Sequence, residues 1–410
     1  MKKIFLIFLI FLTQSESFAQ WIQQASSTTV PLNRIKFVNR NTGWICGDAG
    51  TILKTTNGGS NWFAQSSGVP NKILTCISPV NDSVVYCVGW FQTVLKTIDG
   101  GSNWMILENG QFGQVNSYHS CFFLNEQIGW IGTTLPGTLR TVDGGKSFVQ
   151  QPFFDTPKDI YFKDGLNGIY SGGGTVGKTT NGGNNWNITI IETPGIGLEI
   201  FKRLSVINNL TGYIVGDRGT TYKTTNFGIS WDNVGFITDV QEFMYCSKFI
   251  NDSLGYAGGN FTRLFKTTNG GKSWVRQAMN NGSPYDIFCF SDSVVWLCGK
   301  PGIIWNTVTG GQTSISQISQ NIPESFNLSQ NYPNPFNPST TIKFSIKNKS
   351  NYKLEIFNSL GKLIEELFNK QLTVGEYEYK FDGSNLTSGI YFYKLSSEQF
   401  TQTKKMTFVK

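Results

Sequence analysis

The nonapeptide Lys54-Thr-Thr-Asn-Gly-Gly-Ser-Asn-Trp62 recurs along the chain and decides its fold. Five close copies follow it, at Lys96–Trp104, Arg140–Phe148, Lys178–Trp186, Lys223–Trp231 and Lys266–Trp274, and a weaker seventh copy spans Asn306–Ser314. Successive copies lie roughly 38–45 residues apart, which is the period of a four-stranded propeller blade. The sequence therefore predicts an all-β chain with a seven-bladed β-propeller over residues 20–320.

The composition agrees with many short strands joined by tight turns. Of the 410 residues, 45 are glycine, and only 15% are charged. The formal net charge is +7, but the basic residues form no run or stripe, which argues against a nucleic-acid partner.

The N-terminus has the features of an export signal. Lys2 and Lys3 precede the apolar run Ile4–Leu12, and Ser17-Phe18-Ala19 offers a small-residue cleavage site. Residues 1–19 thus resemble a secretory signal peptide. No later stretch reaches the ~18 apolar residues of a membrane span, so we expect no membrane-spanning segment in the mature chain.

Cysteine and histidine usage limits the chemistry. The seven cysteines lie within apolar strand segments, so buried free thiols are expected, although the odd count leaves disulfides open. His119 is the one histidine of the chain, which argues against multi-histidine metal sites and Ser-His-Asp catalysis. We expect no metal, no cofactor and no catalytic residue of these classes.

The repeated turn has a structural explanation. An Asn or Asp side chain bonds amides of its own loop, glycines adopt positive φ, and the closing aromatic residue is buried. The pattern resembles the Asp-box hairpin of sialidases, xyloglucanases and photosystem II assembly-factor propellers. That resemblance implies that the boxes are structural, with these residues: Asn57, Trp62, Asp99, Trp104, Asp143, Phe148, Asn181, Trp186, Asn226, Trp231, Asn269 and Trp274.

The last blade lacks part of its own sequence. Ser314 and Thr309 stand where the seventh box should carry Trp and Asn, whereas Trp21-Ile-Gln-Gln resembles the strand that follows a normal box. We predict that Trp21–Ala25 completes this blade, which would remove an exposed sheet edge.

Residues 321–410 differ in composition and form a predicted antiparallel β-sandwich. They contain Tyr332-Pro-Asn-Pro-Phe-Asn-Pro338 and Ser388-Gly-Ile-Tyr-Phe-Tyr-Lys-Leu395. Both blocks closely resemble the type A C-terminal sorting domain of the type IX secretion system known from the Bacteroidetes. The resemblance implies the type IX machinery as a partner of residues 321–410, with a mature protein that is secreted or attached to the outer-membrane surface.

The activity of the propeller is less well defined. Resemblance of residues 20–320 to the assembly-factor propellers implies a role in binding other proteins. We favour a binding module for an unknown protein or glycan ligand, with its site on the face opposite the boxes. Candidate ligand-binding residues are Asp48, Trp90, Phe91, Tyr118, His119, Arg203, Asp217, Arg218, Arg263 and Tyr285, with Phe153-Phe154 in a further loop. Solvated loops with incidental aromatic residues are an open alternative. A glycoside hydrolase is a second hypothesis, because Asp48 and Asp217 occupy equivalent hairpins, and glycosidases use two carboxylates.

Overall fold

The computed structural model describes residues 21–108, 116–134, 137–151, 155–193, 195, 197–237, 243–277, 279–308, 310, 315–319, 321–383 and 386–410. The predicted signal peptide, Phe153-Phe154, Thr309 and Ser314 lie outside these residues. The chain divides into two compact units, of which the first is Trp21–Gly311 and the second contains Gln312–Lys410.

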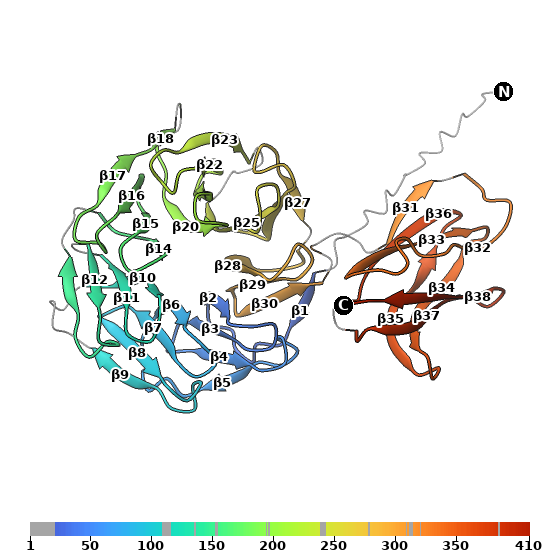
Figure 1. The fold of residues 1–410 in the computed structure, drawn as a ribbon, viewed down its shortest axis with the longest axis horizontal. Helices are drawn as coiled ribbons and strands as arrows, with labels where there is room; N and C mark the ends of the chain where they lie inside the picture. The colour runs from blue at the N-terminus through green and yellow to red at the C-terminus, as the bar shows by residue number, and fades with distance from the viewer. Residues whose placement is uncertain are drawn as a thin grey trace, which may run out of the picture. The chain divides into compact units, whose positions relative to one another are not determined.

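Seven four-stranded antiparallel sheets form the first unit, in agreement with the predicted seven-bladed propeller. Figure 1 shows them arranged as blades around a central axis. The innermost strands are β2 (Leu32–Phe37), β6 (Leu74–Pro79), β10 (Tyr118–Phe123), β14 (Asp159–Phe162), β20 (Phe201–Val206), β24 (Met244–Phe249) and β28 (Ser283–Cys289). The second strands are β3 (Gly43–Gly47), β7 (Val85–Gly89), β11 (Gly129–Thr133), β15 (Gly168–Ser171), β21 (Gly212–Gly216), β25 (Gly255–Gly259) and β29 (Val295–Lys300).

The outer half of each blade contains the strands on either side of the repeated turn. The third strands are β4 (Ile52–Thr55), β8 (Thr93–Thr97), β12 (Thr138–Thr141), β16 (Thr175–Thr179), β22 (Thr220–Thr224), β26 (Arg263–Thr267) and β30 (Ile303–Thr307). The outermost strands are β5 (Phe63–Gln65), β9 (Met105–Glu108), β13 (Val149–Gln151), β17 (Asn187–Ile190), β23 (Asp232–Phe236), β27 (Val275–Gln277) and β1 (Ile22–Gln24). A two-stranded hairpin, β18 (Glu192–Thr193) and β19 (Gly197–Leu198), follows β17.

The N-terminal strand closes the ring, which confirms the predicted seam. In β1, Ile22 and Gln24 pair with Asn306 and Ile304 of β30. Trp21 packs edge-on against Tyr256 of blade six, with 6.2 Å between ring centroids. Trp62 of the first box packs in the same way against Trp296 of blade seven, at 6.1 Å. Trp21 therefore replaces the tryptophan that the seventh box lacks.

The six complete boxes share one hydrogen-bond pattern. In the first box, the Thr55 hydroxyl donates to Asn57 Oδ1 at 3.0 Å and accepts from the Gly59 amide at 2.8 Å. Asn57 Oδ1 also accepts from the Asn61 amide at 3.0 Å. Asp99 accepts the equivalent bonds in the second box. Asn and Asp alternate between boxes because this geometry needs only an acceptor oxygen at that position.

Several boxes also receive side chains from the preceding blade. Lys54 Nζ donates to the Gly100 carbonyl at 2.7 Å, and Lys96 Nζ donates to the Gly144 carbonyl at 3.0 Å. The Trp130 indole and the Tyr256 hydroxyl donate to the carbonyls of Gly182 and Gly310. The lysine and the glycine-flanked aromatic residue of the repeat therefore join neighbouring blades.

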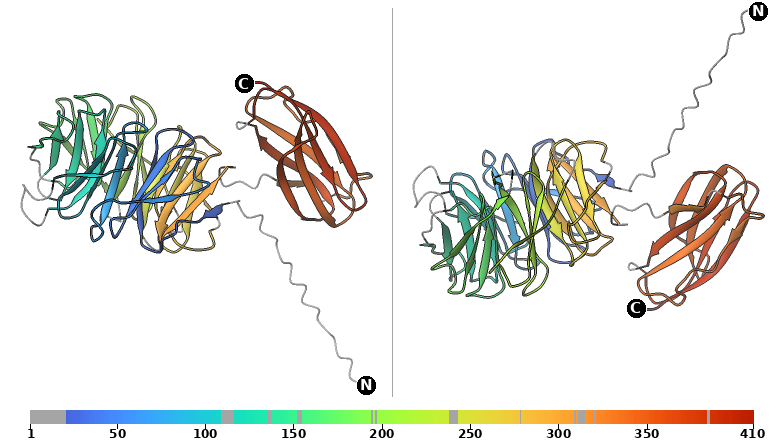
Figure 2. Two further views of the ribbon diagram at one scale, coloured as in Figure 1. Left: turned by 90° about the horizontal axis from the view of Figure 1, so that it is seen from below. Right: turned by 90° about the horizontal axis from the view of Figure 1, so that it is seen from above.

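The ring has two distinct faces, which Figure 2 shows from the side. On the first, named the link face, the hairpins between second and third strands meet the links between blades: the Gly50 amide donates to the Lys72 carbonyl at 2.6 Å. On the opposite face, named the box face, the boxes meet the turns after the innermost strands, as in the bond from the Gly58 amide to the Asn41 carbonyl.

All seven cysteines are free thiols, as expected, and six of them are buried. Cys46 and Cys87 lie in the apolar cluster between blades one and two, and Cys76 and Cys121 lie in the cluster between blades two and three. They act as small apolar residues at the blade interfaces.

The second unit is an antiparallel β-sandwich. Its sheets are β31-β36-β33-β32 and β35-β34-β37-β38. The strands are β31 (Ile315–Ser319), β32 (Asn327–Leu328), β33 (Ser339–Ile346), β34 (Ser350–Asn358), β35 (Leu363–Leu372), β36 (Gly375–Asp382), β37 (Gly389–Ser396) and β38 (Thr401–Phe408). Because β31 pairs with β36, residues 315–319 belong to the sandwich, whereas the sequence division at 320/321 assigns them to the propeller.

Candidate functional site

Each innermost strand pairs with the second strand of its blade, and this register aligns the seven innermost strands with one another. The alignment defines three levels of side chains around the central axis. The link level, nearest the link face, contains Asn33, Thr75, His119, Lys158, Lys202, Tyr245 and Tyr285. The middle level contains Arg34, Cys76, Ser120, Asp159, Arg203, Cys246 and Asp286, and the box level contains Lys36, Ser78, Phe122, Tyr161, Ser205, Lys248 and Phe288. In six of the seven strands the register shifts beside the link level, as β-bulges do where a side chain is redirected.

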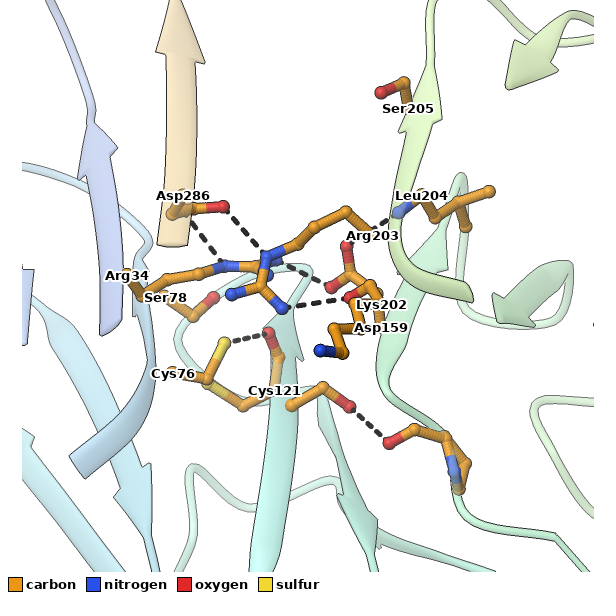
Figure 3. A network of polar contacts seen from close by, with 12 residues as sticks. Arg34, Cys76, Ser78, Cys121, Asp159, Lys202, Arg203, Leu204, Ser205 and Asp286 are labelled. Carbon is orange, nitrogen blue, oxygen red and sulfur yellow. Dashed lines mark hydrogen bonds and ion pairs between the residues drawn. The ribbon is translucent and has the colours of Figure 1, made fainter. Parts of the chain in front are cut away.

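Four charged residues of the middle level form a network across the ring, which we name the plug: Arg34, Asp159, Arg203 and Asp286 (Figure 3). Arg34 Nη2 donates to Asp159 Oδ1 at 2.6 Å, and Arg34 Nε lies 3.6 Å from Asp286 Oδ2. Arg203 Nε donates to Asp286 Oδ1 at 2.9 Å. Blades one, four, five and seven are thereby joined through their innermost strands.

Burial makes the charge balance of the plug necessary. Arg34 is 4% exposed and Asp286 is 2% exposed. Desolvation opposes the charge of Arg34, but Asp159 and Asp286 outweigh it and raise its pKa. Desolvation likewise opposes the charge of Asp286, and Arg34 and Arg203 outweigh it and lower the pKa of that carboxyl. The plug therefore pairs two buried or nearly buried arginines with two buried carboxylates.

The plug carboxylates also accept hydrogen bonds from backbone amides of the next blade. The Leu204 amide donates to Asp159 Oδ2 at 3.0 Å, and the Ile35 amide donates to Asp286 Oδ2 at 3.1 Å. Ser78 and Ser205 accept the Phe123 and Phe249 amides in the same manner. These carboxylates thus serve as structural acceptors, and both are occupied by arginines, which does not suit general acid or base catalysis.

The link level forms a half-buried polar rim above the plug. Lys202 Nζ lies 4.2 Å from the centroid of Tyr245, whose ring meets Tyr285 edge-on at 5.0 Å. The Tyr245 hydroxyl donates to Asn260 Oδ1 at 2.7 Å. Burial lowers the pKa of Lys202 to about 8. Burial, together with Lys158, lowers the pKa of His119 to about 4, so this imidazole is neutral at pH 7.

Two hairpins on the link face hold exposed aromatic residues in an uncommon backbone conformation. Trp90 and Phe91 are 40% and 53% exposed, and Phe261 in blade six is 66% exposed. Phe91 and Gln92 have φ of 56° and 58°, and Phe261 and Thr262 have φ of 50° and 59°. Positive φ at a bulky residue is unfavourable, so each hairpin presents its phenylalanine at a conformational cost. Lys72 Nζ lies 4.8 Å from the Phe91 ring.

The structure corrects three of the candidate ligand-binding residues. Tyr118 is fully buried in the cluster between blades two and three. Arg203 belongs to the plug, and Asp217 is buried and accepts the Ile200 amide at 3.0 Å. Their sequence positions beside surface loops did not reveal that their side chains point into the protein.

The other candidates lie on the link face but do not form one cluster. Asp48 accepts a hydrogen bond from Asn33 Nδ2 at 2.9 Å. Burial raises the pKa of Tyr285, and the negative charge of Asp48 contributes to that increase. His119 bonds Thr134 Oγ1 at 3.1 Å, and Arg218 is exposed in a blade-five hairpin. Arg263 begins β26, beside the exposed Phe261.

Sequence reasoning missed the residues that matter most around the axis: Arg34, Asp159, Asp286, Lys202 and Tyr245. A usable signal was present, because Arg34, Asp159 and Asp286 lie at one fixed offset before the second strand of their blade, and Lys202 and Tyr245 lie one residue earlier. A polar or charged residue at such a position, within an otherwise apolar strand, indicates a side chain that faces the central axis.

Within the described residues, the structure holds no cluster of His, Cys, Asp and Glu that could bind a metal ion. The same residues include no helix that is long and apolar enough to span a membrane.

Comparisons with known proteins identify both parts. Residues 330–409 match the secretion system C-terminal sorting domain family, and residues 199–337 match the photosynthesis system II assembly factor YCF48 family. The protein is thus a β-propeller joined to an export-sorting domain. Its propeller is of the YCF48-like type, and its tail agrees with the predicted type IX sorting domain, which implies secretion or attachment to the cell surface. No curated protein matches the chain.

Solved structures support the fold. The structure described as YCF48 bound to D1 peptide has a TM-score of 0.58 at 18% identity, covering 71% of this chain and 96% of that one. YCF48 from Cyanidioschyzon merolae gives 0.58 at 19% identity, covering 70% and 99%. The extracellular domain of a putative one-component system from B. thetaiotaomicron gives 0.52 at 11% identity, covering 95% of this chain and 59% of that one.

Proposed function

We propose that the protein is an exported binding module that takes a protein or glycan ligand on the link face of its propeller. In this proposal the sorting domain directs type IX secretion, and the mature protein is displayed on the outer membrane or released. The observation that carries the binding role is the exposure of Trp90, Phe91 and Phe261 on hairpins held at positive φ. Asn or Gly would meet the positive φ of these hairpin turns at a lower cost, so folding does not explain the bulky aromatic residues there. Exposed aromatic side chains are common at binding hot spots.

The rim beneath these hairpins offers complementary polar groups. Lys202 and Tyr245 form a cation–π pair, and Tyr285 lies against Tyr245. A ligand segment on this face would meet aromatic edges and one partly desolvated ammonium group. The YCF48 structure in complex with a peptide is a propeller of the same fold, which supports a peptide as one class of ligand.

The test uses the mature chain with a glycan array, a peptide library and a reducing-sugar assay. A variant carrying Trp90→Ser and Phe91→Gly should lose at least about tenfold in affinity, since buried aromatic anchors contribute about 2 kcal/mol or more. Phe63→Ser is the matched control, because Phe63 is also exposed but lies on an outermost strand. Unchanged binding in the double variant would reject this face, and release of reducing sugar would favour the glycoside hydrolase instead.

A further inference from the structure

A second feature lies at the other end of the central axis, on the box side of the plug. Strand β2 runs from the link face to the box face, so Lys36 lies beyond Arg34 toward the boxes. Side chains two residues apart project from the same side of a strand, so Lys36 and Arg34 share an orientation. Lys248 and Phe288 occupy the same level, two residues beyond Cys246 and Asp286.

These three residues are neighbours around the ring. Strand β28 lies between β24 and β2, so Phe288 stands between Lys248 and Lys36. Burial lowers the pKa of Lys36 to about 8, and the positive charges of Arg34 and Lys248 contribute to this decrease. Both lysines also act on the thiol of Cys289 at the end of β28. Two cations therefore lie at one level of the axis, on strands separated only by β28.

No anion compensates them at this level. Among its seven described residues the box level contains no carboxylate, and within the described chain neither ammonium group has a hydrogen-bond or ion-pair partner. The carboxylates that act on Lys36 are those of Asp286 and Asp159, which are already paired with the plug arginines. Ser78 and Ser205 are likewise occupied by backbone amides.

The remaining wall of this end is aromatic. Phe122 and Tyr161 meet edge-on at 5.2 Å, and Phe288 packs against Phe37 at 5.4 Å. Apolar walls reduce the local dielectric constant, and a charge-assisted bond from an ammonium group is then stronger than in water. The two lysines, Phe122, Tyr161 and Phe288 are all half-buried, so each retains some contact with solvent.

We propose that Lys36 and Lys248, with Phe288 between them, bind an oxyanion: a sulfate, phosphate or carboxylate group. This site is separate from the link face and does not depend on the function proposed for it. An oxyanion would supply the missing negative charge and would raise the pKa of Lys36 toward its ordinary value.

Sulfate is the probe, because its charge is constant between pH 7 and pH 9. Thermal melts of the mature chain compare sulfate with chloride at equal ionic strength, and calorimetry measures the affinity. Sulfate stabilises most proteins because it is excluded from their surface. The difference in sulfate stabilisation between variants therefore measures binding at the proposed site. We expect a variant with Lys36→Met and Lys248→Met to lose the site-specific part of the sulfate stabilisation. Lys146→Met, which removes an exposed box-three lysine, should retain it.

A second measurement does not depend on the double variant folding. The sulfate affinity of the unmodified protein should fall severalfold from pH 7 to pH 9, whereas Lys36→Arg should keep its affinity because arginine stays charged. Displacement of sulfate by trigalacturonate would identify a carboxylate on a larger ligand as the source, and its failure would identify a free anion. Equal sulfate responses in all variants, or a pH-independent affinity, would overturn the proposal.

Discussion

Arg34 and Asp159 are 125 residues apart in the sequence, yet Arg34 Nη2 donates to Asp159 Oδ1 at 2.6 Å across the central axis. The bond connects blade one with blade four, which are not neighbours in the ring. Propeller blades otherwise contact only the adjacent blades, so the plug adds cross-links that a simple stack of repeats lacks.

Removal of the plug arginine should be costly. Arg34→Met leaves two buried carboxylates with one remaining arginine, and breaking a buried ion pair costs about 3–5 kcal/mol. We expect urea denaturation to show a loss of that size. Arg40→Met removes an exposed arginine and should change the free energy of unfolding by less than about 0.5 kcal/mol. Similar stabilities for the two variants would show that the plug is not a stabilising element.

The plug should also make stability depend on pH. Because Arg34 and Arg203 outweigh desolvation and hold the pKa of Asp286 below its unfolded value, this carboxylate stabilises the folded state above roughly pH 4. The contribution is lost as the pH falls through the lower, folded-state pKa. We therefore expect the difference between the unmodified protein and Asp286→Asn to be largest at pH 5–7 and to shrink below pH 4. Denaturant melts over that range test this, and a constant difference would contradict it.

Trp21 should contribute more to stability than its terminal position suggests. Replacement by Ala removes a buried ring that contacts Tyr256, at a cost of about 3–5 kcal/mol. Ile22→Ser is the matched control, because the Ile22 side chain on the same strand is exposed. Calorimetry should show a lower Tm for Trp21→Ala alone. Deletion of 21–25 should also expose the edge of β30 and promote self-association, which size-exclusion chromatography measures.

Phe227 occupies a box position where the other complete boxes have glycine, at a φ of 54°. Its ring is 2% exposed, and Lys163 Nζ lies 4.5 Å from its centroid. Phe227→Gly removes the buried ring but also removes the cost of a positive φ at a bulky residue. The loss of the ring should be the larger effect, so this variant should be destabilised by about 2–4 kcal/mol. Phe227→Ala should destabilise it further, because alanine keeps the positive-φ cost. A higher Tm for Phe227→Gly in calorimetry would instead show that backbone strain at this position outweighs the packing of the ring.

Much of the fold was predictable because its determinants are local. A box is nine residues long, and its threonine, Asn or Asp, glycines and tryptophan bond one another, as Thr55, Asn57 and Gly59 do. The seam was predictable for the same reason, since Trp21 carries the recognisable sequence of an outermost strand. The domain boundary was harder to predict. Strand β31 belongs to the second unit because it pairs with β36, and its own sequence does not indicate that partner.

The candidate site was predicted only in part. Trp90 and Phe91 lie exposed on the link face, where a hairpin position alone places them. Tyr118, Arg203 and Asp217 were wrong as surface residues. Tyr118 and Arg203 lie on innermost strands, where a bulge that the sequence does not show sets the direction of the side chain. Asp217 is buried in the hairpin after β21, where it accepts the Ile200 amide.

The sequence by itself determined the repeat, the number of blades, the closing strand and the sorting tail, because each depends on contacts between residues close together or on a recognisable motif. Only the tertiary structure decided what occupies the central axis. Arg34, Asp159, Arg203 and Asp286 come from four different blades, and Lys36 and Lys248 come from blades one and six. Their proximity follows from closure of the ring, which places the equivalent residues of all the repeats at the same level around the central axis.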